Sequence, residues 1–235
     1  MNRELTNRIR FVLEELLPPI LRDSAPMRWL FRRHWGGLID EIESFRERAH
    51  HVSDEEYAAI YTALPRIHEE TDLSEACVTR ILDSLEGPKV LDVGCGTGVL
   101  LQRIAAAAKP GVESLAGLDF QIDDALRSSM TDVRLEESKI EQLPFEDAEF
   151  DTVICTHVLE HILDIRAAVA ELRRICRSRL IIVVPKEREY RFTFNPHLHF
   201  FAYPHSFLRH MLPVPADAVC EQIGRDFFYT ETIRR

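Results

Sequence analysis

Apolar residues recur at helical spacing in the first part of the chain. Between residues 4 and 17 they stand three or four positions apart, at Leu5, Ile9, Val12, Leu13 and Leu16. The two prolines that follow predict the end of this helix. A second helix is predicted to run from Ser53, which forms a capping-box pattern with Glu56, toward residue 64.

Short apolar runs alternate with helical patterns farther along the chain. Strands are predicted at residues 90–93, 115–119, 152–156 and 180–184, and helices at residues 73–85, 99–108 and 165–176. Because the strands are almost continuously apolar, this alternation predicts an α/β fold in which helices cover both faces of a mostly parallel sheet. The stretch from 119 to 143 is short for a helix and a strand. A crossover helix near 122–128 should therefore have only one or two turns, or be partly unwound.

Residues 90–98 have the sequence VLDVGCGTG. An apolar run that ends in three alternating glycines predicts a buried strand turning sharply into a helix, with bare main chain at the turn. Such a turn can hold a nucleotide-like ligand, and a tight turn without a ligand is the alternative. Val99 stands where a dinucleotide fingerprint needs its third glycine, and no Gly-Lys-Ser/Thr ending of a phosphate-binding loop follows.

Four further motifs follow the glycine turn in order. They are GLD at 117–119, LPFED at 143–147 with Phe150 and Asp151 after it, VLEH at 158–161, and the apolar run 180–185. With residues 91–98, these motifs resemble the class I S-adenosylmethionine-dependent methyltransferases over about half of the chain. The resemblance implies a Rossmann-like methyltransferase domain over residues 72–235, with S-adenosylmethionine as cofactor. Residues 1–71 would form an amino-terminal helical extension, as a cap or a partner-binding element.

The resemblance also implies which residues bind the cofactor. The implied set is Asp92, Gly94, Cys95, Gly96, Gly98, Asp119, Phe120, Ile140 and Thr156. Asp119 ends a predicted strand, where its two carboxylate oxygens can accept both hydroxyls of a ribose. A helix cap is the alternative role for Asp119. Many relatives carry an acidic residue where this chain has Lys139, which cannot accept a hydrogen bond from the adenine amino group. Glu141 is a candidate substitute.

The segment HVLEH at residues 157–161 has two interpretations. His-x-x-Glu-His is the inverted zinc-protease motif, and on a helix His157 and His161 would share one face and could share a metal. In a methyltransferase, either histidine could instead act as general base for a hydroxyl nucleophile. His161 has a structural alternative as well, in which a hydrogen bond anchors the loop after the predicted strand.

Two aromatic segments stand outside these motifs. Residues 190–203 are dense in rings and are expected either to face the substrate as a wall or lid, or to pack in the core. Within them His197 and His199 alternate as on a strand and could bind a metal or a sugar-like substrate. In residues 28–35 arginines interleave with Trp29, Phe31 and Trp35. Core packing is the favoured interpretation there, and contact with RNA or anionic lipid is the alternative.

Composition narrows the class of protein. The 235 residues suit one domain with an appendage, and the formal net charge of −10 disfavours nucleic acid as a partner. The five cysteines are scattered without a Cys-x-x-Cys pair, and no signal core or membrane-length apolar run is present. These features predict a cytoplasmic protein with reduced thiols and make no prediction of oligomeric state.

The sequence thus predicts methyl transfer from S-adenosylmethionine to a small-molecule or glycan-like acceptor, at oxygen. The oxygen prediction depends on the histidines, because a hydroxyl usually needs a base. A cofactor-binding regulatory or scaffold protein without catalysis is the alternative. A zinc hydrolase built on His157, Glu160 and His161 is a more remote one.

Overall fold

The computed structural model describes residues 9, 11–51, 53, 56, 73–190 and 196–234. The chain divides into two compact units. The amino-terminal unit consists of Met1–Glu69 with Glu187–Ala202, and the sheet unit consists of Glu70–Lys186 with Tyr203–Arg235. The expected domain boundary between residues 71 and 72 lies outside the described residues and stays a prediction.

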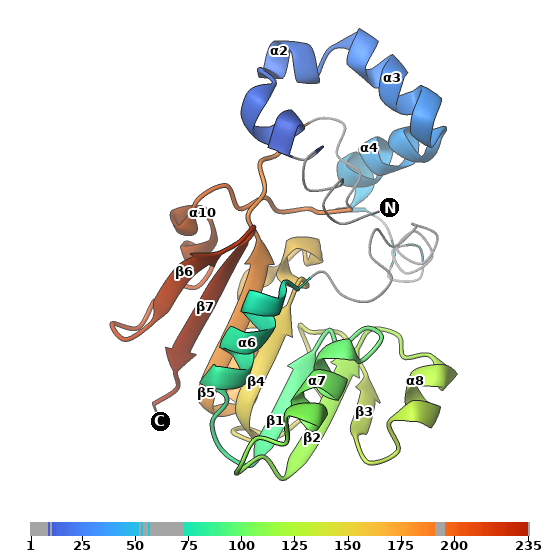
Figure 1. The fold of residues 1–235 in the computed structure, drawn as a ribbon. Helices are drawn as coiled ribbons and strands as arrows, with labels where there is room; N and C mark the ends of the chain where they lie inside the picture. The colour runs from blue at the N-terminus through green and yellow to red at the C-terminus, as the bar shows by residue number, and fades with distance from the viewer. Residues whose placement is uncertain are drawn as a thin grey trace. The chain divides into compact units, whose positions relative to one another are not determined.

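Seven strands form one sheet in the order β3-β2-β1-β4-β5-β7-β6 (Figure 1). They are β1 Lys89–Val93, β2 Ser114–Asp119, β3 Arg134–Glu137, β4 Phe150–Thr156, β5 Cys176–Pro185, β6 Val219–Ile223 and β7 Asp226–Thr232. The pairs from β3 through β5 are parallel, and β7 runs antiparallel to both β5 and β6. The mostly parallel sheet predicted from the apolar runs is therefore confirmed.

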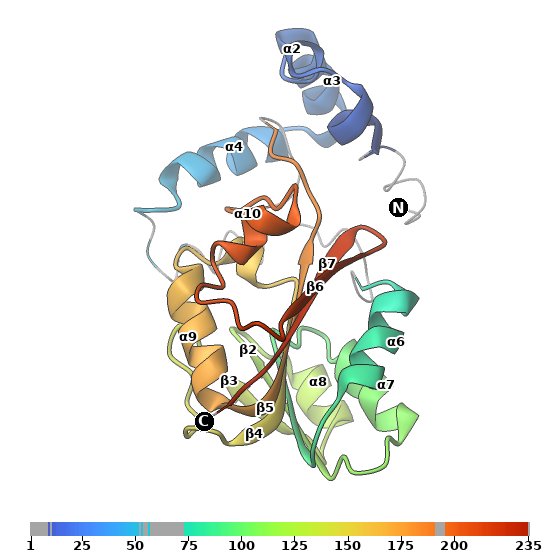
Figure 2. The ribbon, with the colours of Figure 1, turned by 90° about the vertical axis from the view of Figure 1, so that its left-hand side faces the viewer.

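Helices cover both faces of this sheet. They are α6 Glu75–Ser84, α7 Val99–Ala107, α8 Asp124–Ser129, α9 Ile165–Ile175 and α10 Pro204–Leu208, with a 3₁₀ turn η2 Leu159–His161. Figure 2 shows α9 on the opposite side of the sheet from α6 and α7. Apolar side chains of α6 and α7 pack with β1, β4, β5 and β7 in one buried cluster. The short crossover helix near 122–128 is confirmed as α8, six residues long, which Asp123 caps by accepting from the Leu126 N–H at 2.7 Å.

Three strands were not predicted from the sequence. β3 has the sequence RLEE and lies at one edge of the sheet, so half of its surface is exposed and no apolar run marks it. β6 forms the opposite edge, also with little buried surface. β7 is almost fully buried, yet it begins and ends with polar residues. Apolar continuity therefore detected only the central parallel strands.

The amino-terminal unit is helical in its described part. Its elements are the π-helix η1 Val12–Leu16 and the α-helices α2 Pro19–Arg22, α3 Ala25–Trp35 and α4 Leu38–Arg48. Their buried side chains form a small core with the segment 187–202, made by Leu13, Phe31, Ile39 and Tyr190. Arg46 Nη1 also donates to the Tyr190 carbonyl at 3.1 Å. The segment 187–202 is thus part of this unit.

The sequence predictions for this unit had mixed outcomes. Ile9, Phe11 and η1 are the described helical part of the helix predicted at 4–17, since residues 1–8 and 10 lie outside the described set. The Glu56 N–H donates to the Ser53 hydroxyl at 3.2 Å, as a capping pattern requires, while residues 57–64 lie outside the described set. Core packing holds for Phe31, which is 4% exposed, and is wrong for Trp29, which is 65% exposed. The side chain of Trp35 is not among those described.

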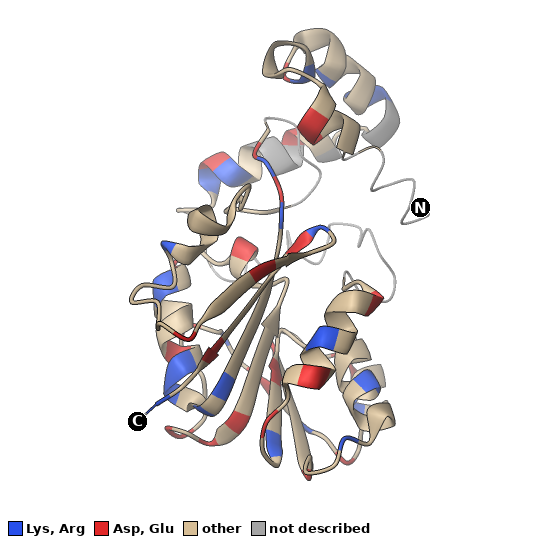
Figure 3. Cartoon of the chain, turned by 60° about the vertical axis from the view of Figure 1, so that its left-hand side comes forward, with Lys and Arg blue, Asp and Glu red and all other residues tan. Residues whose placement is uncertain are grey.

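Charged residues follow this layering in the sheet unit. In Figure 3 most of the length of the central strands is uncharged, and Lys, Arg, Asp and Glu stand mainly on the helices, near strand ends and on the edge strand β3. None of the described helices combines the length and the apolar composition that a bilayer-spanning segment requires.

Candidate active site at the carboxyl edge of the sheet

The turn between β1 and α7 lies at the carboxyl end of the parallel strands. Its three glycines all have positive φ angles, 80° at Gly94, 53° at Gly96 and 75° at Gly98. The N–H groups of Gly94 and Cys95 both donate to the Leu118 carbonyl of β2, at 2.7 and 3.0 Å. The Gly98 N–H donates to the Cys95 carbonyl at 2.8 Å. The predicted sharp turn from strand to helix is therefore present.

Two of these glycines have different surroundings. A Cβ at Gly94 would lie 2.1 Å from Val158 Cγ2, so the loop after β4 packs directly on the turn. A Cβ at Gly96 would meet no atom within 4 Å, so the main chain there is open to a ligand. The Cys95 side chain is buried, and burial raises the pKa of its thiol. Cys95 can therefore offer a ligand its main chain rather than a thiolate.

Asp119 ends β2 beside this turn, as the sequence predicted. Its Oδ2 accepts from the Gly96 N–H at 2.7 Å, and its Oδ1 lies 3.4 Å from the Gln121 nitrogen. The helix-cap alternative for Asp119 is wrong, because Asp123 caps the following helix. Phe120 is 43% exposed next to Asp119, where an aromatic face remains available to a flat ring.

Asp92 places a carboxyl group deep under the turn. The side chain is 1% exposed, and its Oδ1 has no hydrogen-bond partner among the described residues. Burial, with a further contribution from the charge of Asp119, raises the pKa of Asp92 to about 7. A buried carboxylate oxygen without a partner fits a cationic ligand, because such a ligand would stabilise the ionised form. This orphaned oxygen and the open main chain at Gly96 are features that S-adenosylmethionine would fit.

The end of β3 forms the next part of this edge. Glu137 Oε1 accepts from the Ile122 N–H and from Arg127 Nη2, both at 3.0 Å. These two bonds lower the pKa of Glu137, the Ile122 N–H having the larger effect. Beyond β3, Lys139 is exposed and Ile140 is 5% exposed. Ile140 is thus buried, and its contact with the adenine ring stays a prediction, as does the acceptor role of Glu141.

Two residues of α9 hold the loop that follows Ile140. Arg174 donates to the carbonyls of Leu143 and Phe145, at 3.0 and 2.7 Å. Glu171 accepts from the Leu143 N–H at 2.9 Å and also pairs with Arg174. Sequence reasoning missed this clamp, because its members stand about thirty positions from the loop. The sequence offers one indication of this clamp, because Glu171 and Arg174 are three positions apart and therefore share one face of the helix.

His157 follows β4 directly and has an unusual backbone. Its φ is +54°, and its N–H donates to the Val183 carbonyl of β5 at 2.9 Å. Nδ1 lies 3.5 Å from Glu160 Oε1, and Nε2 lies 3.5 Å from Asp226 Oδ1. Both carboxyl groups are buried, and Asp226 Oδ2 lies 3.5 Å from the Cys77 sulfur. Sequence reasoning missed Asp226, which comes from the unpredicted strand β7.

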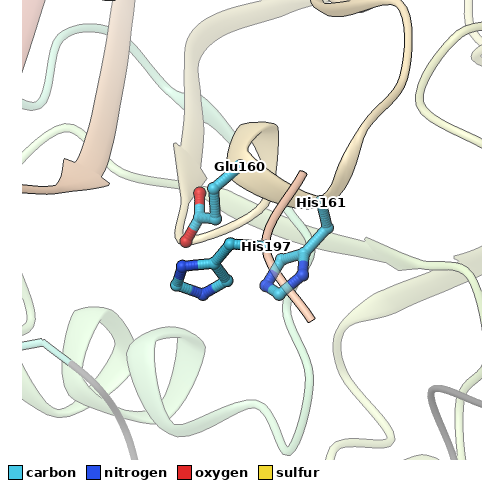
Figure 4. A group of neighbouring side chains, drawn as sticks. All are labelled: Glu160, His161 and His197. Carbon is cyan, nitrogen blue, oxygen red and sulfur yellow. The ribbon is translucent and has the colours of Figure 1, made fainter. Parts of the chain in front are cut away.

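The zinc interpretation of this segment required both histidines on one helix face. The 3₁₀ turn η2 has only three residues, and His157 lies outside it in a left-handed conformation. The i and i+4 geometry of the inverted zinc motif is therefore absent from this loop. Figure 4 shows Glu160 and His161 leaving adjacent positions of η2. Thr156, the last residue of β4, is half-buried at the same edge.

The aromatic segment 190–203 belongs to the amino-terminal unit as far as Ala202. In it His197 is buried, with Nδ1 2.7 Å from Glu187 Oε2, so this histidine anchors its own segment. The His199 ring stacks on Phe201, with ring centroids 6.5 Å apart. Residues 191–195, part of the expected wall or lid, lie outside the described residues.

Comparison with known proteins points to one family. Residues 91–184 match the family model described as a methyltransferase domain. A ubiquinone biosynthesis O-methyltransferase of Paracidovorax citrulli is 32% identical over 142 residues, which cover 58% of this chain and 57% of that relative. The chain spans about half the length of the curated relatives that it matches, between 36% and 57% for three of them.

Solved structures share the fold. A Pyrococcus horikoshii protein has a TM-score of 0.53 at 18% identity, over 75% of this chain and 99% of that one. A SAM-dependent methyltransferase of Aquifex aeolicus has a TM-score of 0.50 at 17% identity, over 67% and 88% of the two chains. Residues 91–184 are thus a methyltransferase domain similar to those of S-adenosylmethionine-dependent enzymes, and the ordered motifs, the glycine turn and Asp119 imply S-adenosylmethionine as its cofactor.

Proposed function

We propose that this protein transfers a methyl group from S-adenosylmethionine to a hydroxyl oxygen of a small-molecule acceptor, glycan-like acceptors included. One observation carries the proposal: Val158 packs on Gly94, so the loop after β4 that also contains His157 borders the glycine turn. The name of the Paracidovorax citrulli relative, an O-methyltransferase, supports oxygen as the acceptor atom.

Each part of the cofactor has a matching group in this proposal. S-adenosylmethionine supplies an electrophilic methyl carbon with a thioether leaving group. Asp119 accepts the ribose hydroxyls, and the open main chain at Gly96 lets the ligand approach closely. Asp92 contributes negative charge from its unpartnered oxygen. Phe120 and Ile140 provide apolar contacts for the adenine ring.

His157 is the proposed general base. The acceptor oxygen forms its bond to the methyl carbon while its proton passes to an imidazole nitrogen, and the proton later leaves to solvent. Glu160 and Asp226 lie 3.5 Å from the two ring nitrogens. One carboxylate can hold the remaining N–H, and both stabilise the imidazolium that forms. His161, from the same loop, is the second candidate base.

Turnover of methyl-labelled cofactor on a panel of phenols, catechols and sugars tests this proposal. His157→Gln is expected to lower kcat by about a hundredfold to ten-thousandfold, with cofactor affinity retained. His161→Gln tests the second candidate base in the same assay. His205→Gln changes an exposed histidine of α10 and, as the matched control, should keep the wild-type kcat. Full activity of both His157→Gln and His161→Gln would refute the base assignment. Cofactor binding without transfer to any acceptor would favour the regulatory or scaffold alternative.

A further inference from the structure

Large apolar side chains are concentrated on the outside of the amino-terminal unit. Thirteen large hydrophobic residues are exposed among those described, and seven of them lie between residues 11 and 30. These seven are Phe11, Val12, Leu16, Ile20, Leu21, Trp29 and Leu30. Leu13 and Phe31, on the same elements, are buried in the core of the unit. The exposed side chains thus stand on helices whose other side chains form a core, and we call the set together the amino-terminal apolar face.

Arginines border this face on α3. Trp29 is 65% exposed, and together with Arg32 and Arg33 it lines a shallow, open depression. Asp40 pairs with Arg28 at 2.9 Å and with Arg32 at 2.6 Å. Two arginines of α3 therefore share one carboxylate, and Arg33 adds a third positive charge beside Trp29. An indole ring beside guanidinium groups suits a phosphate ester, since arginine matches phosphate geometry and tryptophan prefers the boundary between water and lipid.

The charge of the segment is opposite to that of the chain. Residues 1–35 contain seven arginines and four acidic residues, a formal charge of +3, whereas the whole chain has −10. An anionic surface would attract this segment and repel the rest of the chain. A second copy of this chain presents the same positive charge, so pairing of two such faces would bring arginines together. The charge therefore favours an anionic partner over the pairing of two such faces.

We infer that the amino-terminal apolar face binds the surface of anionic lipid bilayers. Trp29 and Leu30 enter the boundary between headgroups and acyl chains, while Arg32 and Arg33 contact lipid phosphates. This surface lies in a different unit from the glycine turn, so the inference does not depend on methyl transfer.

Co-sedimentation of the full chain with lipid vesicles tests this inference. The chain is expected to bind vesicles that mix phosphatidylcholine with phosphatidylglycerol, to bind pure phosphatidylcholine vesicles at least tenfold more weakly, and to dissociate as salt is added. The double variant Trp29→Gln with Leu30→Gln should bind at least tenfold more weakly, and so should Arg33→Glu. Val219→Gln, at an exposed apolar position of β6, is the matched control and should bind normally.

Near-ultraviolet circular dichroism and S-adenosylhomocysteine titration of each variant separate lost binding from lost folding. Equal binding to neutral and anionic vesicles would overturn the role of charge. Failure of the folded chain to bind any vesicle at low salt would overturn the inference. Concentration-dependent dimerisation that the double variant abolishes, without vesicle binding, would assign the face to a second copy instead.

Discussion

Asp92 and His157 are the two residues whose surroundings are most unusual. Asp92 is a buried carboxyl group with one oxygen unpartnered, and His157 holds a left-handed backbone between two buried carboxyl groups. Both conditions are costly in a protein without a ligand or a reaction to use them. The place of Asp92 under the glycine turn, and of His157 in the loop that packs on this turn through Val158, therefore supports a functional role for each.

The raised pKa of Asp92 predicts how stability depends on pH. The pKa of Asp92 is about 7 in the folded protein and near 3.8 in the unfolded chain. The stability that the protonated carboxyl group contributes is therefore fully present below pH 4 and is lost as pH rises through 7. The lost stability approaches about 4 kcal/mol at most. Thermal unfolding from pH 5 to 9 should show the wild type losing stability relative to Asp92→Asn as pH rises. Melting curves that stay parallel over this range would contradict the raised pKa.

The two glycines of the turn predict different costs for the same substitution. Both have positive φ, so an added methyl group strains each backbone by about 1–2 kcal/mol. Only at Gly94 would it also overlap Val158, which adds about 1–3 kcal/mol. Urea unfolding should therefore show Gly94→Ala as clearly less stable than Gly96→Ala. Equal losses in the two variants would mean that the loop after β4 does not rest on Gly94.

Among the elements, the central strands could be predicted and the edges could not. β1, β4 and β5 are nearly continuous apolar runs because helices cover both of their faces. β3 and β6 each have only one neighbouring strand and carry polar residues, so periodicity does not mark them. Because β7 was not predicted either, its residue Asp226 could not be predicted as part of the site. Asp226 reaches His157 only because β7 inserts between β5 and β6.

The clamp on α9 predicts that a helix residue far from the turn supports cofactor binding. Arg174→Ala removes hydrogen bonds to the Leu143 and Phe145 carbonyls and should lower the free energy of unfolding by about 2–3 kcal/mol. It should also weaken S-adenosylhomocysteine binding several-fold, because Ile140 lies in the loop that the clamp supports. Arg166→Ala, at an exposed position of the same helix, is the control for calorimetry and unfolding. Unchanged affinity in Arg174→Ala would separate the clamp from the cofactor site.

At the scale of the whole molecule, local motifs predicted the methyltransferase domain, whereas contacts distant in sequence join residues 187–202 to the amino-terminal unit. The glycine turn, the acidic residue at the end of β2 and the loop after β4 could each be predicted, because each is specified by a short motif of consecutive residues. Residues 187–202 join the amino-terminal unit through contacts such as that of Arg46 with Tyr190, which are distant in sequence. Patterns of neighbouring residues cannot predict contacts between residues so far apart in the sequence.

Calorimetric titration of the full chain with S-adenosylmethionine decides whether the glycine turn is a cofactor site. The wild type should bind, and Asp119→Ala should bind at least tenfold more weakly, because the ribose loses its carboxylate acceptor. Asp132→Ala, an exposed aspartate before β3, should bind like the wild type. If the wild type does not bind, or if Asp119→Ala binds equally well, the site assigned to this turn is wrong.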